Sequence, residues 1–153
     1  MAKSFRCRLI TPDAQVLDAK ASAAVIPAWD GQMGILPDRA AFVAKLGPGE
    51  LRLDFPPPEP GSSSKEFGGG SRSYFVEGGF AHMVKNELML LATQAIPAES
   101  LIEGDAQAEL AEVTARKESA SDAASVERLR AQRQRAAAKL RVARNFKASG
   151  SGI

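Results

Sequence analysis

The residue types that most often carry catalysis are scarce in this chain of 153 residues, which has one histidine, His82, and one cysteine, Cys7. A hydrolase or transferase needs a nucleophile, a base and a group that orients them, and no such set can be assembled here. His82 lies in a strand-like segment and is predicted to be an edge or surface residue. Cys7 lies on the apolar side of an alternating segment, which predicts a buried small hydrophobe and not a reactive thiol.

The sequence also does not predict a metal site or a phosphate-binding loop. One histidine and one cysteine do not make the ligand set of a zinc site, and no acid pair recurs at ligand spacing. Gly68-Gly69-Gly70 lacks the Lys-Ser/Thr that follows in a phosphate-binding loop, and no helical pattern follows it. The sequence therefore predicts a chain without an active site, metal or cofactor, whose role is mechanical or regulatory.

Composition is that of an ordinary soluble globular protein, with 44% hydrophobic and 25% charged residues. No run approaches the roughly 18 apolar residues that span a bilayer, and the first residues show no signal peptide. The formal net charge of +2 hides an uneven distribution. The segment 99–118 carries the acids Glu99, Glu103, Asp105, Glu109, Glu112 and Glu118. The segment 123–147 carries the bases Arg128, Arg130, Arg133, Arg135, Lys139, Arg141, Arg144 and Lys147.

Period-two alternation predicts an all-β sandwich of about ten strands over residues 1–97. The apolar run 23–26, which Pro27 should end, and Ile35-Leu36, closed by Pro37, predict a tight corner between two strands. The continuous run Leu88–Leu91 predicts a strand buried on both faces. Residues 56–73 are rich in Pro, Gly and Ser and predict a mobile loop inserted into a hairpin.

Beyond Pro97 the hydrophobic period becomes helical, which predicts an antiparallel helical hairpin over residues 98–147 and a disordered tail over 148–153. Asp122 is a suitable N-cap for the second helix. The first apolar stripe is Ile102, Ala106, Leu110 and Val113, and the second is Val126, Leu129, Ala136, Leu140 and Ala143. Because these stripes are rich in alanine, the hairpin should be only marginally stable by itself.

The stretch from Val25 to Ala41 resembles the N-terminal signature of the epsilon subunit of rotary F-type ATP synthases. The matching residues are Ile26-Pro27, Gly31, Gly34-Ile35-Leu36-Pro37, Ala40 and Pro48-Gly49. The Gly78-Gly79-Phe80 block and the C-terminal Ala138–Val142 also fit, so the resemblance covers nearly the whole chain apart from the insertion.

This resemblance implies a non-catalytic central-stalk (rotor) subunit that links the gamma subunit to the membrane c ring and couples proton flow to ATP synthesis. Its partners would be gamma, the c ring and the alpha and beta subunits, at the cytoplasmic face of a bacterial inner (plasma) membrane, with membrane association only through the complex. The implied c-ring or gamma contacts lie in the loop 30–39, at Asp30, Gly31, Gln32, Met33 and Arg39. Arg39 stands where the family usually has His, so a contact there would not respond to pH.

The resemblance also implies a switch. In bacterial relatives the two helices leave the sandwich, and the basic helix meets an acidic loop of a beta subunit and blocks ATP hydrolysis. The residues suited to that contact are Arg128, Arg130, Arg133, Arg135 and Arg141. Some relatives bind ATP through Ile-Asp-x-x-Arg-Ala, but here Ile102 replaces the Asp and Asp105 replaces the Arg, so ATP binding is not expected.

A second function class is a β-sandwich protein that binds nucleic acid through its basic helix. Eight bases could neutralise several phosphates, and such binding would weaken steeply with salt. Against this alternative, Phe146 is the only aromatic residue of the basic helix, and the acidic first helix would mask it.

Overall fold

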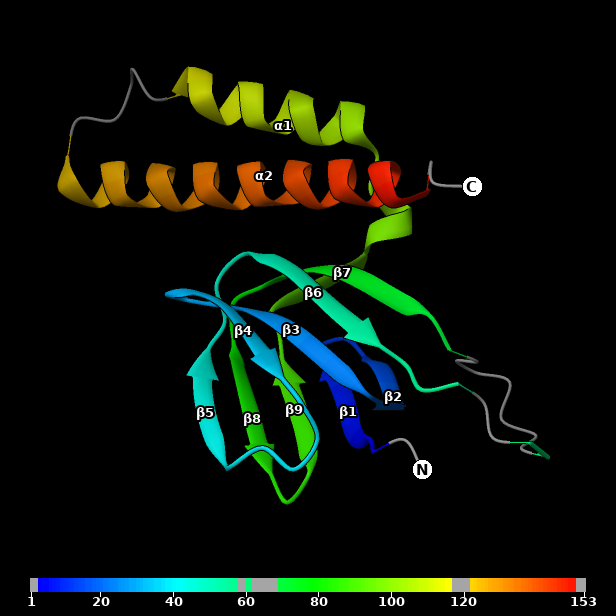
Figure 1. Ribbon diagram of the computed structural model, residues 1–153. Helices are drawn as coiled ribbons and strands as arrows, with labels where there is room; N and C mark the ends of the chain where they lie inside the picture. The colour runs from blue at the N-terminus through cyan, green and yellow to red at the C-terminus, as the bar shows by residue number, and fades with distance from the viewer. Residues whose placement is uncertain (1–2, 58–59, 62–68, 117–121, 151–153) are drawn as a thin grey trace.

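The computed structural model describes residues 3–57, 60–61, 69–116 and 122–150, and within them the chain forms ten strands in two sheets followed by two α-helices (Figure 1). Sheet A contains β1 (Phe5–Ile10), β2 (Gln15–Ala21), β5 (Phe42–Lys45), β8 (Phe80–Val84) and β9 (Glu87–Leu91), in the order β2-β1-β9-β8-β5. Sheet B contains β3 (Ala23–Ala28), β4 (Gly31–Ile35), β6 (Gly49–Asp54), β7 (Ser71–Glu77) and β10 (Gln94–Pro97), in the order β10-β7-β6-β3-β4. The predicted sandwich and helical hairpin are both confirmed.

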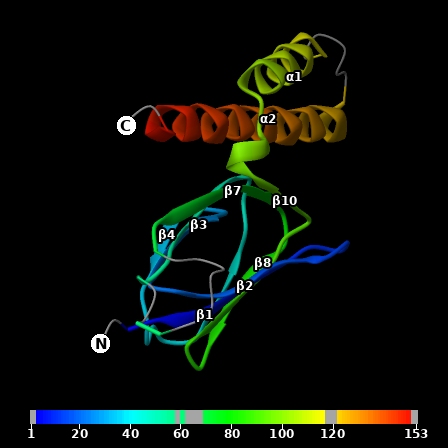
Figure 2. The same cartoon turned by 90° about the vertical axis from the view of Figure 1, so that its right-hand side faces the viewer.

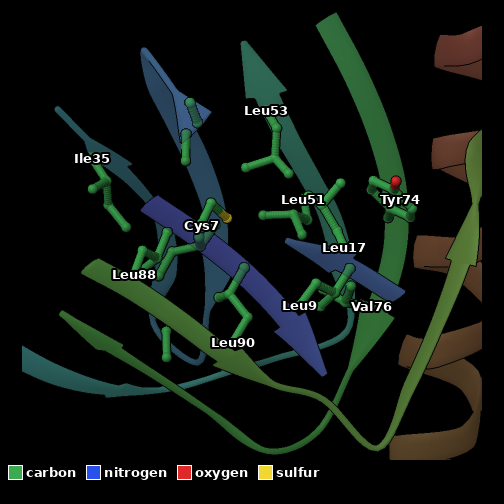
Figure 3. Close-up of a cluster of buried hydrophobic side chains, with 14 of the residues drawn as sticks. Cys7, Leu9, Leu17, Ile35, Leu51, Leu53, Tyr74, Val76, Leu88 and Leu90 are labelled. Carbon is green, nitrogen blue, oxygen red and sulfur yellow. The ribbon is translucent and has the colours of Figure 1, made fainter. Parts of the chain in front are cut away.

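The core lies between the two sheets, where alternate side chains of each strand point inward (Figure 3). Cys7 and Leu9 of β1 face Leu51 and Leu53 of β6 across this space, and all four side chains are fully buried. The alternation read from the sequence thus places Cys7 as predicted. The strands of sheet A and sheet B pair antiparallel except β1 and β9, which run parallel.

Two predicted strand boundaries are wrong. Pro27 does not end its strand, because β3 continues to Ala28 and Pro27 pairs opposite Gln32 of β4. β6 pairs with β3 only along Ala23–Val25, so the missing N–H of Pro27 removes no bond to β6. The predicted insertion 56–73 also ends earlier than expected, because β7 begins at Ser71, which pairs with Asp54 of β6. Residues 58–59 and 62–68 of that insertion lie outside the described residues.

The strand β9 is buried on one face and not on both. Leu88 and Leu90 are fully buried in the core, whereas Met89 is half-buried and Leu91 is 46% exposed. The strand therefore carries apolar side chains on a face of sheet A that no other part of the described chain covers.

The glycine pair before β8 makes a close approach to the backbone of β9. Gly78 and Gly79 have φ values of 66° and 84°, in the left-handed region that favours glycine. A Cβ on Gly79 would overlap the carbonyl oxygen of Leu91. Leu46, which follows β5, donates its N–H to the carbonyl of Gly79 at 3.0 Å. The pair therefore lets β8 turn tightly beside the end of β9.

The helical hairpin stacks in two layers on the outer face of sheet B, with α2 (Ala123–Gly150) on the sandwich and α1 (Glu103–Ala115) on α2 (Figures 1 and 2). A short 3-10 helix, η1 (Ala98–Ser100), joins β10 to this layer. Phe75 of β7, Ala138 and Val142 of α2 and Ala98 of η1 form a small buried cluster where the layers meet. Two of its four members are alanines, so α2 removes little apolar surface from water there.

The helix limits differ from the predicted ones in two ways. Ile102 was predicted on the first apolar stripe, but it precedes α1 and is 64% exposed. Val126 of the second stripe is 51% exposed, because burial along α2 begins only at Ala136. The backbone of α2 also continues through Gly150, into the predicted tail, whereas residues 151–153 lie outside the described part.

The start of α2 is as predicted. The Oδ1 atom of Asp122 accepts a hydrogen bond from the backbone N–H of Ser125 at 2.6 Å, which is an N-cap. Hydrogen bonds with the side chain of Ser125 and then with its backbone N–H lower the pKa of the Asp122 carboxyl below its ordinary value. None of the helices in the described part is both long enough and apolar enough to span a bilayer.

Candidate functional site

The two residues with catalytic potential lie apart and in unlike environments. His82 lies in β8 with its side chain exposed on the outer face of sheet A. Cys7 is fully buried between the sheets, and burial raises the pKa of its thiol to about 12. No group of three or more His, Cys, Asp or Glu side chains able to hold a metal occurs among the residues described by the structure.

Half of the predicted contact loop 30–39 is an edge strand. Asp30 lies in the turn between β3 and β4, whereas Gly31, Gln32 and Met33 belong to β4 itself. Because β4 lies between them, Asp30 and Arg39 stand at opposite ends of this strand. The structure therefore does not gather the five predicted contact residues on one loop, but aligns them along the free edge of sheet B.

Arg39 folds back along this edge. Its Nη1 atom donates a hydrogen bond to the carbonyl oxygen of Gly34 at 2.6 Å, and its guanidinium carbon lies 5.2 Å from the centre of the Phe42 ring. The first contact occupies a backbone acceptor of β4, and the second is a cation–π geometry. Arg39 thus covers part of the β4 edge while remaining exposed itself.

The sequence did not predict an exposed apolar surface on the outer face of sheet A. Val43 of β5, Phe80 of β8 and Leu91 of β9 are 68%, 53% and 46% exposed, and their strands are neighbours in sheet A. Phe80 pairs directly with Leu91, and Val43 pairs with His82, which in turn pairs with the half-buried Met89. We call Val43, Phe80, Leu91 and Met89 the apolar outer face. Its signal in the sequence was the run Leu88–Leu91, which is apolar at both inward and outward positions.

The five arginines predicted to act in inhibition are all exposed on α2, but they differ in their partners. Arg135 makes an ion pair with Glu77 of β7 at 3.1 Å and lies 4.0 Å from Glu109 of α1. The other four make no ion pair with any residue in the described ranges. Those four are Arg128, Arg130, Arg133 and Arg141.

The acidic first helix pairs with the C-terminal half of α2. Lys139 contacts Glu109 at 3.1 Å, and Glu103 receives both Arg144 at 3.2 Å and Lys147 at 3.4 Å. Hydrogen bonds from Arg144 and then Lys147 lower the pKa of Glu103. The predicted charge complementarity within the hairpin is therefore present, and among the described residues the ion pairs of α2 with α1 begin at Arg135.

A narrow groove brings the two predicted sets of residues together. It has a volume of about 170 Å³ and lies between α2 and the sandwich. Gly31 and Gln32 of β4 line one side, and Arg141 and Val142 of α2 line the other. The first residues of β4, Gly31 and Gln32, therefore lie next to the docked helix α2.

The segment Leu101–Ala106, compared above with an ATP-binding motif, leads from η1 into the first residues of α1. Leu101 packs against the cluster around Phe75, and Ile102 points out to solvent. Glu103 follows with its two cationic partners on α2. The charged side chain at the start of α1 is thus the acidic Glu103, which already forms ion pairs within the hairpin.

Comparison with known proteins places these features in a family. Residues 4–98 match the model for the β-sandwich domain of the ATP synthase delta/epsilon chain. An ATP synthase epsilon chain from Rhodopirellula baltica is 34% identical over 109 residues, which cover 71% of this chain and 76% of the relative. One from a Synechococcus strain is 33% identical over 146 residues and covers 94% of this chain and 96% of the relative.

The same fold occurs in solved assemblies. A chain in the mitochondrial ATP synthase of Euglena gracilis matches with a TM-score of 0.68 at 22% identity, covering 97% of this chain and 82% of that one. The sandwich and the matched relatives define the class, which is that of the small delta/epsilon subunits of ATP synthases. The chain belongs to the ATP synthase delta/epsilon family.

Proposed function

We propose that the chain is a non-catalytic rotor subunit that links the gamma subunit to the membrane c ring and couples proton flow to ATP synthesis. The apolar outer face of sheet A carries this proposal. Contiguous apolar patches of this kind mark protein contact sites, and the apolar run of β9 suits a strand that a partner covers on its second face. Membership of the ATP synthase delta/epsilon family supports a partner within that complex, and we take gamma to be this partner.

In this proposal the apolar outer face packs against gamma, and the β4 edge meets the polar loops of the c ring. The edge residues in this role are Asp30, Gly31, Gln32, Met33 and Arg39. Because an arginine stays protonated throughout the physiological range, the Arg39 contact is independent of pH where a histidine would titrate. The subunit is held at the cytoplasmic face of a bacterial membrane through these contacts.

We further propose that the hairpin restrains ATP hydrolysis when it leaves the sandwich. The exposed arginines of α2 that lack ion pairs within the described chain (Arg128, Arg130, Arg133 and Arg141) are available to an acidic loop of a beta subunit. Arg135 joins them once it is released from Glu77. A helix layer held by a small alanine-rich cluster is suited to two alternative positions.

Co-purification tests the assembly proposal. The full chain with a C-terminal tag is recovered from gently solubilised membranes, and the proteins that accompany it are identified. Recovery of gamma with alpha and beta supports the proposal. Recovery of nucleic acid without those subunits would instead support the alternative of a basic nucleic-acid-binding helix.

Truncation tests the inhibitory proposal separately. A chain ending at Pro97 keeps the strands of both sheets and loses the helices. The assembled complex with this truncated chain should hydrolyse ATP faster than the complex with the full chain. An unchanged rate in a complex of normal subunit composition would contradict the inhibitory role and leave the rotor role standing.

A further inference from the structure

Four charged side chains meet where the sandwich, α1 and α2 come together. Arg135 of α2 contacts Glu77 of β7 at 3.1 Å and lies 4.0 Å from Glu109 of α1. Lys139, one turn further along α2, contacts Glu109 at 3.1 Å. No other ion pair between α2 and the sandwich is found in the described part of the chain. Arg135 therefore links all three parts of the molecule, whereas Lys139 has its ion pair with α1 only.

The Glu77 carboxylate is the most enclosed member of this group. Its side chain is 16% exposed, compared with 44% for Arg135, 32% for Glu109 and 20% for Lys139. Leu46, Pro48, Gly78 and the α2 residues Ala131 and Gln132 line the groove beside it. Glu77 thus lies beneath the helix, in a place that α2 covers only while the hairpin is docked.

Because Glu77 is enclosed, its carboxylate can remain charged beneath α2 only while its ion pair with Arg135 is intact. Removing a carboxylate from water is costly, and a nearby cation offsets that cost only while the pair is intact. Burial is the largest influence on Glu77 and raises its pKa, while Arg135 and Lys139 lower it and Glu109 raises it further. The contact with Arg135 therefore makes the carboxylate tolerable under the helix, and it does so without adding a large net attraction.

We infer that Glu77 and Arg135 form an electrostatic latch, in which the cation that permits the hairpin to dock is also one that an acidic partner can remove. When a carboxylate of a partner engages Arg135, Glu77 is left unpaired beneath α2, and the docked position becomes unfavourable. Capture of Arg135 and release of the helix are therefore one event. This inference deepens the inhibitory proposal and rests on it for the identity of the partner. The latch itself can be tested without the partner, because both of its residues lie in this chain.

Hydrogen exchange on the full-length isolated chain tests the latch. Amides 136–143 of α2 lie in the docked half of the helix, where the buried residues Ala136, Ala138, Leu140, Val142 and Ala143 occur. Arg135→Met keeps a long side chain and leaves Glu77 unpaired. These amides should then exchange about tenfold faster, because breaking a buried pair on one side is strongly unfavourable for the docked state.

Three comparisons make this result specific. The double variant Glu77→Gln/Arg135→Met has no carboxylate to leave unpaired and should return to nearly the wild-type exchange rate. Arg133→Met changes a neighbouring exposed arginine that has no ion pair within the described residues, and it should leave exchange unchanged. Lys139→Met keeps the Glu77–Arg135 contact and should also keep α2 docked.

The pH response of the Arg135→Met chain gives a second, independent readout. Protonation of Glu77 removes the unpaired charge, so lowering the pH should restore docking in this variant, as a fall in the radius of gyration measured by X-ray scattering. Protection of amides in β1 and β9 reports that the sandwich remains folded in every chain compared.

Arg135→Met exchanging like the wild type would overturn the latch, as would a double variant that exchanges as fast as the single one. Neither outcome bears on the ATPase test with the chain truncated at Pro97. A latch that behaves as expected together with an unchanged ATPase rate would refute the inhibitory role alone.

Discussion

Cys7 shows how the position of one side chain between the sheets decides its chemistry. The thiol is fully buried and its pKa is raised by burial from 9.0 to about 12. A thiol that stays protonated and enclosed is not a nucleophile under ordinary conditions. We expect thiol reagents at pH 8 to modify Cys7 only as fast as the chain unfolds. Labelling rates followed against denaturant by mass spectrometry check this, and rapid modification of the native chain would contradict it.

The same pKa shift gives a pH dependence of stability. Below pH 9 the Cys7 thiol is protonated in both the folded and the unfolded chain, so its contribution is fully present. Between pH 9 and 12 the unfolded chain loses this proton first, so the free energy of unfolding should fall by about 1.4 kcal/mol per pH unit from this group. Denaturant unfolding of the wild type and of Cys7→Ala at several alkaline pH values isolates this slope, which the variant should lack.

Two glycines should respond to alanine in opposite directions. Gly79 has a φ of 84° and would bring a Cβ onto the carbonyl of Leu91, so Gly79→Ala should destabilise the chain by more than about 2 kcal/mol. Gly104 lies in the first turn of α1 with open space around it, and Gly104→Ala should stabilise by up to about 1 kcal/mol. Thermal unfolding measures the change in stability of each variant. A similar loss of stability in both variants would contradict the prediction.

At the scale of elements, strong local signals predicted the fold and weak ones did not. The alternation in β1 and the N-cap at Asp122 both have a local cause, and both are confirmed. The sequence predicts Ser71 in a loop, because the pairing with Asp54 that makes it a strand residue is long-range. The short β4 has glycine at Gly31 and Gly34 and little alternation, so its sequence resembles a loop. A loop prediction for residues 30–39 therefore groups contact residues that the strand β4 sets apart.

The N-cap of α2 allows a prediction about one element. Asp122→Ala removes the acceptor for the Ser125 N–H and should increase amide exchange in the first turn of α2, leaving the docked half at 136–143 unchanged. Because hydrogen bonding lowers the pKa of Asp122, the cap is intact above the ordinary carboxyl range and is lost as the pH falls through its lowered value. Asp122→Asn, which keeps an acceptor oxygen, should preserve protection and lose that acid dependence.

At the scale of the whole molecule, the two outer faces of the sandwich differ in how far the helices cover them. The outer face of sheet B is partly covered by α2, which packs on Phe75 and pairs with Glu77. The outer face of sheet A carries Val43, Phe80 and Leu91 exposed. In the proposed function, the helical layer on sheet B is the part that moves, and the outer face of sheet A is the part that attaches the subunit to its assembly. The two roles fall on different faces of the sandwich, so the proposed movement of the hairpin leaves the proposed attachment in place.

The attachment surface is tested by placing a charge on it. Val43→Lys introduces a cation into the apolar outer face at a position that is 68% exposed, so the isolated chain should remain as stable as the wild type. Its recovery with the ATP synthase should fall at least about tenfold, because a lysine buried against an apolar partner surface pays for its desolvation. Val126→Lys is the matched control, since Val126 is 51% exposed on α2 and away from sheet A. Equal recovery of the two variants would place the attachment surface elsewhere on the molecule.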